Sequence, residues 1–279
     1  MAKQSTFSPQ PILKWAGGKR QLLPEIRKHL PETYTSYYEP FIGGGALLLD
    51  IQPKHAVVND VNGEIINIYE VIRDHADVLI AALKKHKNER EYFYKQREID
   101  RTSKYAKYSK VERAARIIYL NKTCYNGLFR VNSQGQFNVP YGKYANPNIV
   151  NEAGIRAVQK YFQSANLTFR TGDFESALKG IKKNAFVYFD PPYHPLSMTS
   201  SFTGYTHGGF GEVEQTRLRD LCNKLDKQGC KFLLSNSYCD FICDLYRGYE
   251  QVKIEATRNI NSVGAGRGKI FEVLIRNYE

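Results

Sequence analysis

Residues 187–194 read VYFDPPYH, an apolar run that ends in an acid, two prolines and an aromatic ring. Proline lacks an N–H donor and fixes its own φ, so Pro191 and Pro192 cannot extend a ladder of strand hydrogen bonds. The pattern predicts a buried strand over 185–190 that stops at Asp190 and continues along a rigid path. Because ligands of open α/β sheets bind at the carboxyl ends of strands, this corner is the first candidate site.

Strand-like and helix-like patterns alternate on both sides of this stretch. Apolar runs predict further strands at 36–41, 55–60, 167–174, 230–237, 251–258 and 269–278. Helical spacing predicts helices within 12–31 and at 46–51, 62–86, 111–122 and 212–229. The alternation predicts an α/β fold, with a Rossmann-like sheet covered by helices on both faces. No helix pattern separates the last two strands, which the Gly/Arg-rich NINSVGAGRG joins, so we expect them to pair antiparallel.

A basic segment interrupts the alternation. Between Lys84 and Lys122 there are 13 Lys or Arg residues against 5 Asp or Glu residues, so this segment holds +8 of the chain's net charge of +12. Such a surplus indicates an anionic partner, which could be nucleic acid, an anionic membrane or an acidic protein. We expect residues 62–165 to be an inserted, mostly helical domain with a β-hairpin, and residues 1–61 and 166–279 to form the other domain.

Other features exclude several classes of protein. The first residues, MAKQSTFSPQP, lack the apolar core of a secretory signal, and no apolar stretch has the length of a membrane span. The number of cysteines is odd and no C-x-x-C pair occurs, which indicates neither a disulfide framework nor a zinc site. We therefore expect a cytoplasmic protein without a metal and with reduced thiols at Cys124, Cys222, Cys230, Cys239 and Cys243.

A second candidate site surrounds the glycine-rich turn in EPFIGGGALLLD (39–50). Glycines let the backbone approach a ligand closely, and the helix start that follows favours anions, although the motif alone also fits a tight turn. Asp60 ends the next predicted strand, 17 residues after Gly43, where nucleotide-binding folds place an acid that binds ribose hydroxyls. The pair predicts an adenosine-containing cofactor without specifying which one.

The motif KWAGGKR (14–20) shares a Gly-Lys pair with phosphate-binding loops. It lacks the upstream glycine and the Ser or Thr after the lysine, which disfavours such a loop. Trp15 and Lys19 could instead hold a zwitterionic ligand with a flat ring and a cation. The alternative is a capped loop with an exposed charge.

The chemistry of the proline corner suits one kind of substrate. Asp190 supplies a carboxylate, the two prolines fix at least one backbone carbonyl, and Tyr193 adds a ring. These acceptors match an amino group with two N–H donors on a flat heterocycle. Holding both hydrogens would favour a pyramidal nitrogen whose lone pair can attack a methyl group placed in line. The alternative is a turn that only ends the strand.

Four motifs carry a resemblance to a known family: KWAGGK (14–19), EPFIGGG (39–45), CYNGLFRVNSQGQFNVPYGKY (124–144) and FDPPY (189–193). In this order, over nearly the whole chain, they resemble the Dam-type DNA adenine-N6 methyltransferases, and the DpnM-like members in particular. The resemblance implies a site-specific enzyme that moves a methyl group from S-adenosylmethionine to N6 of a flipped adenine in double-stranded DNA, within GATC. No metal, membrane or obligatory protein partner is expected.

The resemblance also assigns residues by motif position. The target adenine would be held by Asp190, Pro191, Pro192 and Tyr193, whose ring would stack on the base. The domain formed by 1–61 and 166–279 would bind the cofactor through Trp15, Lys19, Phe41, Gly43, Asp60 and Asp190. The inserted domain 62–165 would recognise DNA, and the DNA contacts would come from Lys14, Tyr125, Asn126, Leu128, Arg130 and Pro140.

The segment 124–144 reads as a hairpin or an irregular loop with SQGQ as its turn. Arg130 can form a bidentate hydrogen bond with a guanine edge. Leu128 and Tyr125 have the shape to wedge or stack between bases. For Leu128 and Pro140, packing of the hairpin itself is the alternative role.

Two further segments bear on the resemblance. Lys143 stands where relatives often carry arginine, and lysine is a point charge rather than a fork. The stretch HPLSMTSSFTGYTHGGFG (194–211) follows the proline corner and is either a mobile lid or a plain connector.

Three other functions compete with this hypothesis. Methylation of another planar amino group, in RNA or a glutamine side chain, is typical of relatives with N-P-P-Y, and Asp190 counts against it. An inert DNA-binding protein would be expected to lose that acid. An NAD-dependent oxidoreductase explains Asp60 but neither D-P-P-Y nor the basic insertion.

Overall fold

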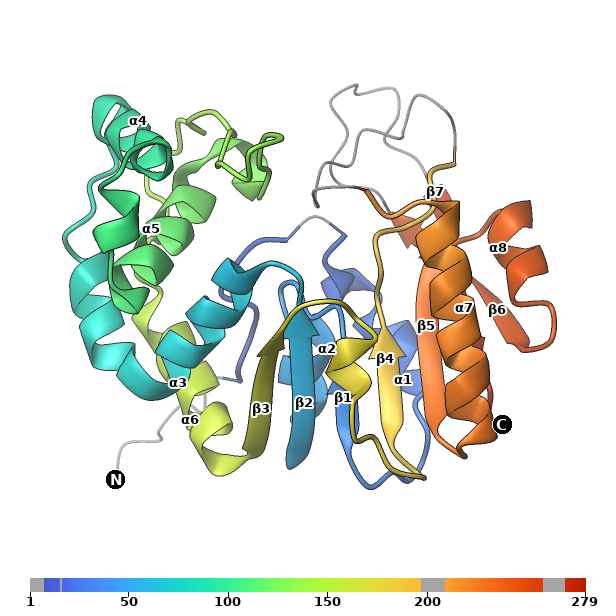
Figure 1. Ribbon diagram of the computed structural model, residues 1–279. Helices are drawn as coiled ribbons and strands as arrows, with labels where there is room; N and C mark the ends of the chain where they lie inside the picture. Colours follow the sequence, from blue (N-terminus) through green and yellow to red (C-terminus); the bar gives the residue numbers. More distant parts are fainter. Residues whose placement is uncertain (1–7, 16, 197–208, 258–268) are drawn as a thin grey trace.

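The computed structural model describes residues 8–15, 17–196, 209–257 and 269–279. The predicted connection at 259–268 lies outside these ranges, and so does most of the predicted lid at 194–211. Within them the chain forms one central sheet with helices on both faces, and a further group of helices at one edge of the sheet (Figure 1).

Seven strands form the sheet in the order β3-β2-β1-β4-β5-β7-β6. Strands β1 to β5 are parallel to one another, and β7 lies between β5 and β6 and is antiparallel to both. The predicted Rossmann-like α/β sheet and the antiparallel final pair are therefore confirmed. The strands are β1 Tyr37–Glu39, β2 His55–Asp60, β3 Asn166–Thr171, β4 Phe186–Phe189, β5 Lys231–Ser237, β6 Glu250–Thr257 and β7 Lys269–Arg276.

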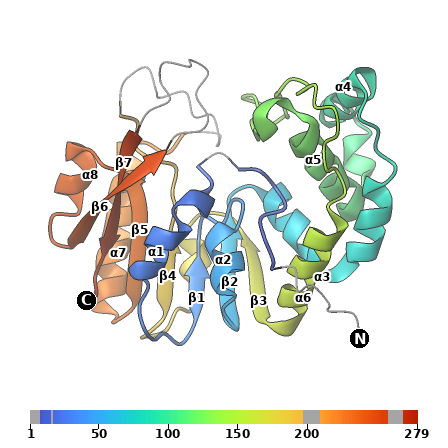
Figure 2. The same cartoon turned by 180° about the vertical axis from the view of Figure 1, so that it is seen from behind.

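Helices cover both faces of this sheet. One face carries α1 (Leu23–Lys28) and α2 (Ala46–Ile51), which lie in front in Figure 2. The other face carries α7 (Glu212–Lys227) and α8 (Asp240–Leu245), together with the short 3₁₀ turn η5 (Ser176–Leu178).

Strand β4 is buried on both faces. Phe186 and Tyr188 enter the core under α1 and α2, whereas Val187 and Phe189 enter the core under α7. A parallel strand with two covered faces is a continuous apolar run in sequence, which explains why the pattern before Asp190 predicts it well.

The helical group at the edge of the sheet joins it through α3 and α6. Helix α3 packs against α5 and α6, and also against β3 and β2. The helices of this group are α3 Gly63–Leu83, α4 Arg90–Glu98, α5 Lys110–Thr123 and α6 Glu152–Ser164. Four further 3₁₀ turns are η1 Lys19–Gln21, η2 Ile99–Arg101, η3 Tyr105–Lys107 and η4 Tyr125–Gly127. The division of the chain at residues 62 and 165 stays a prediction.

Side-chain caps fix the starts of two long helices. The Asn62 side chain accepts from the Glu64 N–H at 3.0 Å, which satisfies a free donor at the start of α3. At the start of α5, Ser109 and Glu112 form a reciprocal capping box. Helices α4, α6 and α8 lie where none is predicted; α4 (REYFYKQRE) buries one residue, Phe93, and therefore shows no apolar stripe.

The direction of the strand order reverses between β1 and β4. From β1 the sheet continues to β2 and β3, and from β4 it continues to β5, so the connections leave on opposite sides. Open α/β sheets bind ligands outside the carboxyl ends of the strands at such a reversal. The glycine turn follows β1 and Asp190 follows β4, so the fold brings both candidate sites to this point.

Candidate active site

Asp190 lies at the carboxyl end of β4, paired with Lys19 of η1. The distance from Lys19 Nζ to Asp190 Oδ1 is 2.7 Å, with side chains 5% and 22% exposed. The Ser235 hydroxyl also donates to Oδ1, at 3.2 Å. Among the residues that the structure describes, none donates to Oδ2, so that oxygen can accept from an incoming group. Burial raises the pKa of Asp190, and the Lys19 ammonium opposes that shift.

Buried amides hold the backbone that follows Asp190. Gln215 Nε2 donates to the Pro192 carbonyl at 3.0 Å, and Asn236 Nδ2 donates to Gln215 Oε1 at 3.0 Å. Asn236 Oδ1 accepts from the His194 N–H at 3.0 Å. Gln215 and Asn236 are fully buried, so this network fixes the proline corner from inside the protein.

Two backbone carbonyls beside the corner already have donors. The Pro192 carbonyl accepts from the buried amide just described, and the Phe189 carbonyl lies 3.4 Å from the Ser235 hydroxyl, whose one hydrogen it shares with Asp190 Oδ1. Within the described ranges, no group donates to the Pro191 carbonyl. With Asp190 Oδ2, this carbonyl gives the corner two acceptor oxygens on successive residues.

Tyr193 is fixed at both ends of its side chain. Its hydroxyl donates to Glu272 Oε2 on β7 at 2.6 Å, and the Lys19 ammonium lies 4.5 Å from the ring centroid. Burial and the Glu272 carboxylate raise the pKa of Tyr193 well above its usual value, so the phenol keeps its proton.

The glycine turn and Asp60 are in direct contact. Gly43 adopts φ 45°, and its N–H donates to Asp60 Oδ2 at 3.0 Å. A Cβ at this position would lie 2.7 Å from the Trp15 indole nitrogen, so only glycine lets the ring pack on the turn. Burial raises the pKa of Asp60 to about 6, against hydrogen bonds from Asn62 and Gly43 that lower it, so the group is ionised at neutral pH.

An apolar surface lies at the carboxyl ends of β1, β2 and β3. Phe41 stacks on Phe174, with ring centroids 5.3 Å apart, and Val61, which follows Asp60, is 57% exposed. Asn59 lies beneath and donates to the carbonyls before Phe41 and at the end of β3, which ties the three strand ends together. Aromatic and aliphatic groups beside an acid suit a flat ring that carries a sugar.

Glu39 is a buried carboxyl group at the end of β1. Its Oε2 accepts from the Tyr37 hydroxyl at 2.7 Å. Burial raises the pKa of Glu39 to about 8, the Tyr37 hydrogen bond opposes this shift, and the charge of Asp190 adds to it. The group is therefore mostly protonated at neutral pH, beneath the Lys19–Asp190 pair.

Glu39→Gln is expected to remove a pH dependence of stability. Between about pH 4.5 and 8 the folded protein holds a proton that the unfolded chain releases, so the free energy of unfolding falls as pH rises through this window. For one proton the slope is about 1.4 kcal/mol per pH unit, and the glutamine variant should lack this contribution. Urea unfolding at pH 5.5, 6.5 and 7.5 measures the slope. Equal slopes in wild type and variant would contradict the assignment, and Glu32→Gln, at an exposed position, is the control.

The segment that contains Arg130 folds back on itself as an irregular hairpin. Isolated antiparallel bridges pair Cys124 with Tyr141 and Val131 with Phe137, and the turn spans 132–136. The predicted turn is present, but no regular strand forms here. The turn η2 supports the hairpin, because Asp100 Oδ2 accepts from the Phe137 N–H at 2.9 Å.

The hairpin presents several of the predicted DNA contacts to solvent. Tyr125 is 54% exposed, and Arg130 and Pro140 are exposed. Arg130 Nε donates to Asn138 Oδ1 at 2.7 Å, which orients the guanidinium. Leu128 is half-buried against the core, as expected of a packing residue. The remaining predicted contacts are Asn126, which is half-buried with φ 56°, and Lys14, which is exposed.

Not every cation of the basic segment (84–122) is available to a partner. Arg116 is 1% exposed, pairs with Asp100 at 2.9 Å, and donates to the carbonyls of Gln96 and Arg97. It therefore holds the helical group together instead of meeting a partner. The exposed basic residues of the segment are Lys84, Lys85, Lys87, Arg90, Lys95, Lys104, Lys107 and Lys110.

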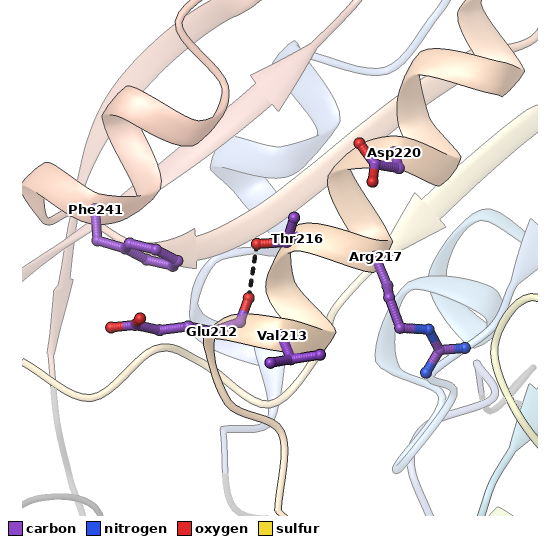
Figure 3. Close-up of a pocket in the computed structure, with 6 residues that line it drawn as sticks. All are labelled: Glu212, Val213, Thr216, Arg217, Asp220 and Phe241. Atoms are coloured by element: carbon purple, nitrogen blue, oxygen red, sulfur yellow. Dashed lines mark hydrogen bonds between the residues drawn. The ribbon is translucent and has the colours of Figure 1, made fainter.

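A shallow pocket lies between the first turns of α7 and Phe241 of α8 (Figure 3). Arg217 points away from α7 there and bonds to Glu175 at 2.8 Å. The His194 ring, close to the proline corner, stacks on Phe241 of this pocket with ring centroids 4.6 Å apart. None of the predicted site residues lines it.

The described residues lack two other kinds of feature. No helix among them is long and apolar enough to cross a membrane. They contain no group of three or more acids, histidines and cysteines that could hold a metal ion. All five cysteines are free thiols.

The structure therefore places Gly43, Asp60 and Asp190, predicted for the cofactor and the target base, at the carboxyl ends of β1, β2 and β4. Lys19 and Asp190 form an ion pair, and Gly43 contacts Asp60. The hairpin contacts the loop of KWAGGKR, because Trp15 stacks on Phe129 with ring centroids 5.0 Å apart. The residues that sequence analysis missed are Glu39, Gln215, Ser235, Asn236 and Glu272. The polar residues that end the apolar run LLSNS (233–237) are a signal for Ser235 and Asn236.

Comparison with known proteins identifies the family. The profile of the D12 class N6 adenine-specific DNA methyltransferases matches residues 15–260. The chain is 46% identical over 280 residues to the type II methyltransferase M1.LlaDCHI of Lactococcus lactis subsp. cremoris, which covers 100% of this chain and 99% of the relative. It is 42% identical to the type II methyltransferase M.MjaIII of Methanocaldococcus jannaschii, over 96% of this chain and 99% of the relative. It is 34% identical to the DNA adenine methylase of Serratia marcescens, over 94% of this chain and 96% of the relative. The chain belongs to the D12 class of N6 adenine-specific DNA methyltransferases.

Proposed function

We propose that this enzyme transfers a methyl group from S-adenosylmethionine to N6 of an adenine that is flipped out of double-stranded DNA, within the sequence GATC. The observation that carries the proposal is the proline corner, with two acceptor oxygens beside the ion pair between the buried Lys19 and Asp190. The choice of GATC rests on the resemblance of the hairpin motif to Dam-type enzymes. Because its substrate is DNA, we expect the enzyme to act in the cytoplasm.

The residues at the strand ends fit S-adenosylmethionine. The ionised Asp60 would accept the ribose hydroxyls, and Phe41, Phe174 and Val61 would pack on the adenine ring. Lys19 and Asp190 offer one cation and one anion, which complement the zwitterionic amino-acid end. Trp15 and Gly43 would complete the wall on that side. When bound, S-adenosylmethionine supplies an electrophilic methyl group.

The proline corner would hold the target base. Asp190 Oδ2 and the Pro191 carbonyl would accept the two N–H groups of the adenine amine, and the Tyr193 ring would stack on the base. The Gln215 bond to Pro192 keeps the acceptors in place, so little reorganisation is needed when the base arrives. Holding both hydrogens directs the nitrogen lone pair toward the methyl group.

Residues 62–165 would act as the DNA-recognition domain, and 1–61 with 166–279 as the catalytic domain. Arg130 would read a guanine edge and Lys14 a base near the target. Tyr125, Leu128, Asn126 and Pro140 would contact the bases and backbone that the flipped adenine leaves.

The direct test is methyl transfer to plasmid DNA. Tritium should pass from labelled S-adenosylmethionine into the plasmid. The product should then resist a nuclease blocked by GATC methylation and be cut by one that requires it. Label without a change in GATC cleavage would retain the methyltransferase and reject GATC; no label would reject the whole proposal.

Affinity for DNA is expected to fall steeply with salt. Each phosphate that a Lys or Arg neutralises contributes about −0.9 to the slope of log K against log salt. The double variant Lys104→Ala/Lys107→Ala should make that slope less steep, by up to about two units. Fluorescence anisotropy at several salt concentrations measures it. The control is Lys224→Ala/Lys227→Ala, which removes two lysines from the last turn of α7, outside the basic segment. A flat salt response in the wild type would contradict DNA binding by the basic segment.

A further inference from the structure

The side chain of Asn121 connects two segments that lie far apart in the sequence. Asn121 belongs to α5 and is 1% exposed. Its Oδ1 accepts from the Lys14 N–H at 2.9 Å, and its Nδ2 donates to the carbonyls of Lys14 and Gly127, both at 2.9 Å. One buried amide therefore holds the loop that contains Trp15 and the start of the hairpin.

Close packing surrounds these three hydrogen bonds. Gly127 adopts φ 63°, and a Cβ there would lie 2.6 Å from Lys14 Cδ. Trp15 stacks on Phe129 of the hairpin and also packs on the Gly43 turn. The contacts run without a gap from the glycine turn, through the Trp15 loop, to the hairpin that carries Arg130.

We infer that Asn121 is a positioning residue that couples cofactor binding to DNA recognition. The inference rests on the function proposed above, in which the Trp15 loop contacts S-adenosylmethionine and the hairpin reads DNA. A ligand that orders the loop against the glycine turn also orders the hairpin, because Asn121 holds both backbones. DNA then binds with a smaller entropic cost, and by linkage DNA must tighten cofactor binding by the same factor.

The test measures coupling instead of activity. The dissociation constant of a duplex with one GATC site is determined by fluorescence anisotropy with and without saturating S-adenosylhomocysteine, and the ratio is the coupling factor. We expect a factor of about 5–150 in the wild type, a typical range for coupled sites. In Asn121→Ala the factor should fall toward 1. A matched control is Asn67→Ala, which removes another buried asparagine of the helical group, one that donates to the Lys110 carbonyl at 2.9 Å.

The control separates coupling from stability. Both variants lose a buried amide, so both should melt at a lower temperature, but only Asn121→Ala should lose coupling. A folded Asn121→Ala with the wild-type factor would overturn the inference. If Asn121→Ala does not fold, Gly127→Ala is the deciding variant, because its Cβ displaces Lys14 while the Asn121 side chain remains. An unchanged coupling factor in Gly127→Ala would also overturn the inference. Wild type that binds both ligands without coupling would refute this inference alone, whereas failure to bind either ligand would refute the proposed function as well.

Discussion

Asp190→Ala is expected to lower the rate of methyl transfer by about a thousandfold, the upper end of what one preorganised polar group contributes. The variant removes Oδ2, one of the two acceptors proposed for the adenine amine, and leaves the Pro191 carbonyl alone. It also removes the anion opposite Lys19, which is almost fully buried. The hairpin and the basic surface do not contact Asp190, so affinity for DNA should change little. Single-turnover incorporation of tritiated methyl groups measures the rate, and anisotropy measures DNA affinity.

A second substitution separates the acceptor role from simple loss of fold. Asp190→Asn keeps the shape of the side chain and one oxygen, but it loses the charge that pairs with Lys19. It should remain folded and still lose most of the activity, since a carboxamide can turn its NH₂ group toward the substrate. Asp244→Ala, an exposed acid on α8, is the control for loss of a carboxylate. Turnover within about tenfold of wild type in Asp190→Ala, only about 1.4 kcal/mol in the barrier, would refute the proposed role.

Arg130→Ala is expected to reduce the preference for the cognate site by about 5–150-fold, which corresponds to ~1–3 kcal/mol for one bidentate guanine contact. Nonspecific affinity should fall much less, because a single phosphate contact accounts for little of it. The Asn138 side chain and carbonyl bind one edge of the guanidinium, at 2.7 and 3.3 Å. Since a guanidinium has five N–H donors, others remain to reach a base edge.

The measurement compares kcat/KM on duplexes that differ by one base pair, for wild type and variant. Arg90→Ala removes the same charge from α4 and should weaken binding to all duplexes about equally. If Arg130→Ala also lowered kcat/KM on every duplex by one common factor, Arg130 would be a phosphate contact. Arg130→Lys should resemble the alanine variant in specificity, because lysine cannot form the fork.

The sequence was most informative where one local pattern decides the structure. Strand β2 and helix α2 agree with prediction to the residue, because an apolar run or stripe is bounded by residues that end it. The order of the strands was not predictable in this way. Strand β1 has three residues, and its pairing with both β2 and β4 depends on tertiary packing. Helix α4 forms by packing the single buried residue Phe93, which leaves almost no periodic signal.

The candidate site was predictable as two motifs but not as one arrangement. The spacing of Gly43 and Asp60 anticipated a shared site, and their hydrogen bond agrees with it. The pair between Lys19 and Asp190 joins residues of separate motifs, and no local rule predicts it. Counting charges could not show that Arg116 is buried in a structural pair, because the count ignores which side chains face the interior.

Strand β7 has a consequence for synthesis on the ribosome. It is made after the other strands that the structure describes, yet it lies inside the sheet and carries Glu272, the hydrogen-bond acceptor of the Tyr193 hydroxyl. Domains generally fold from the N-terminus as they emerge. A nascent chain that stops before Lys269 would leave β5 and β6 without the strand that joins them. We therefore expect the nascent enzyme to stay inactive until β7 has left the exit tunnel, long after the helical group could have folded.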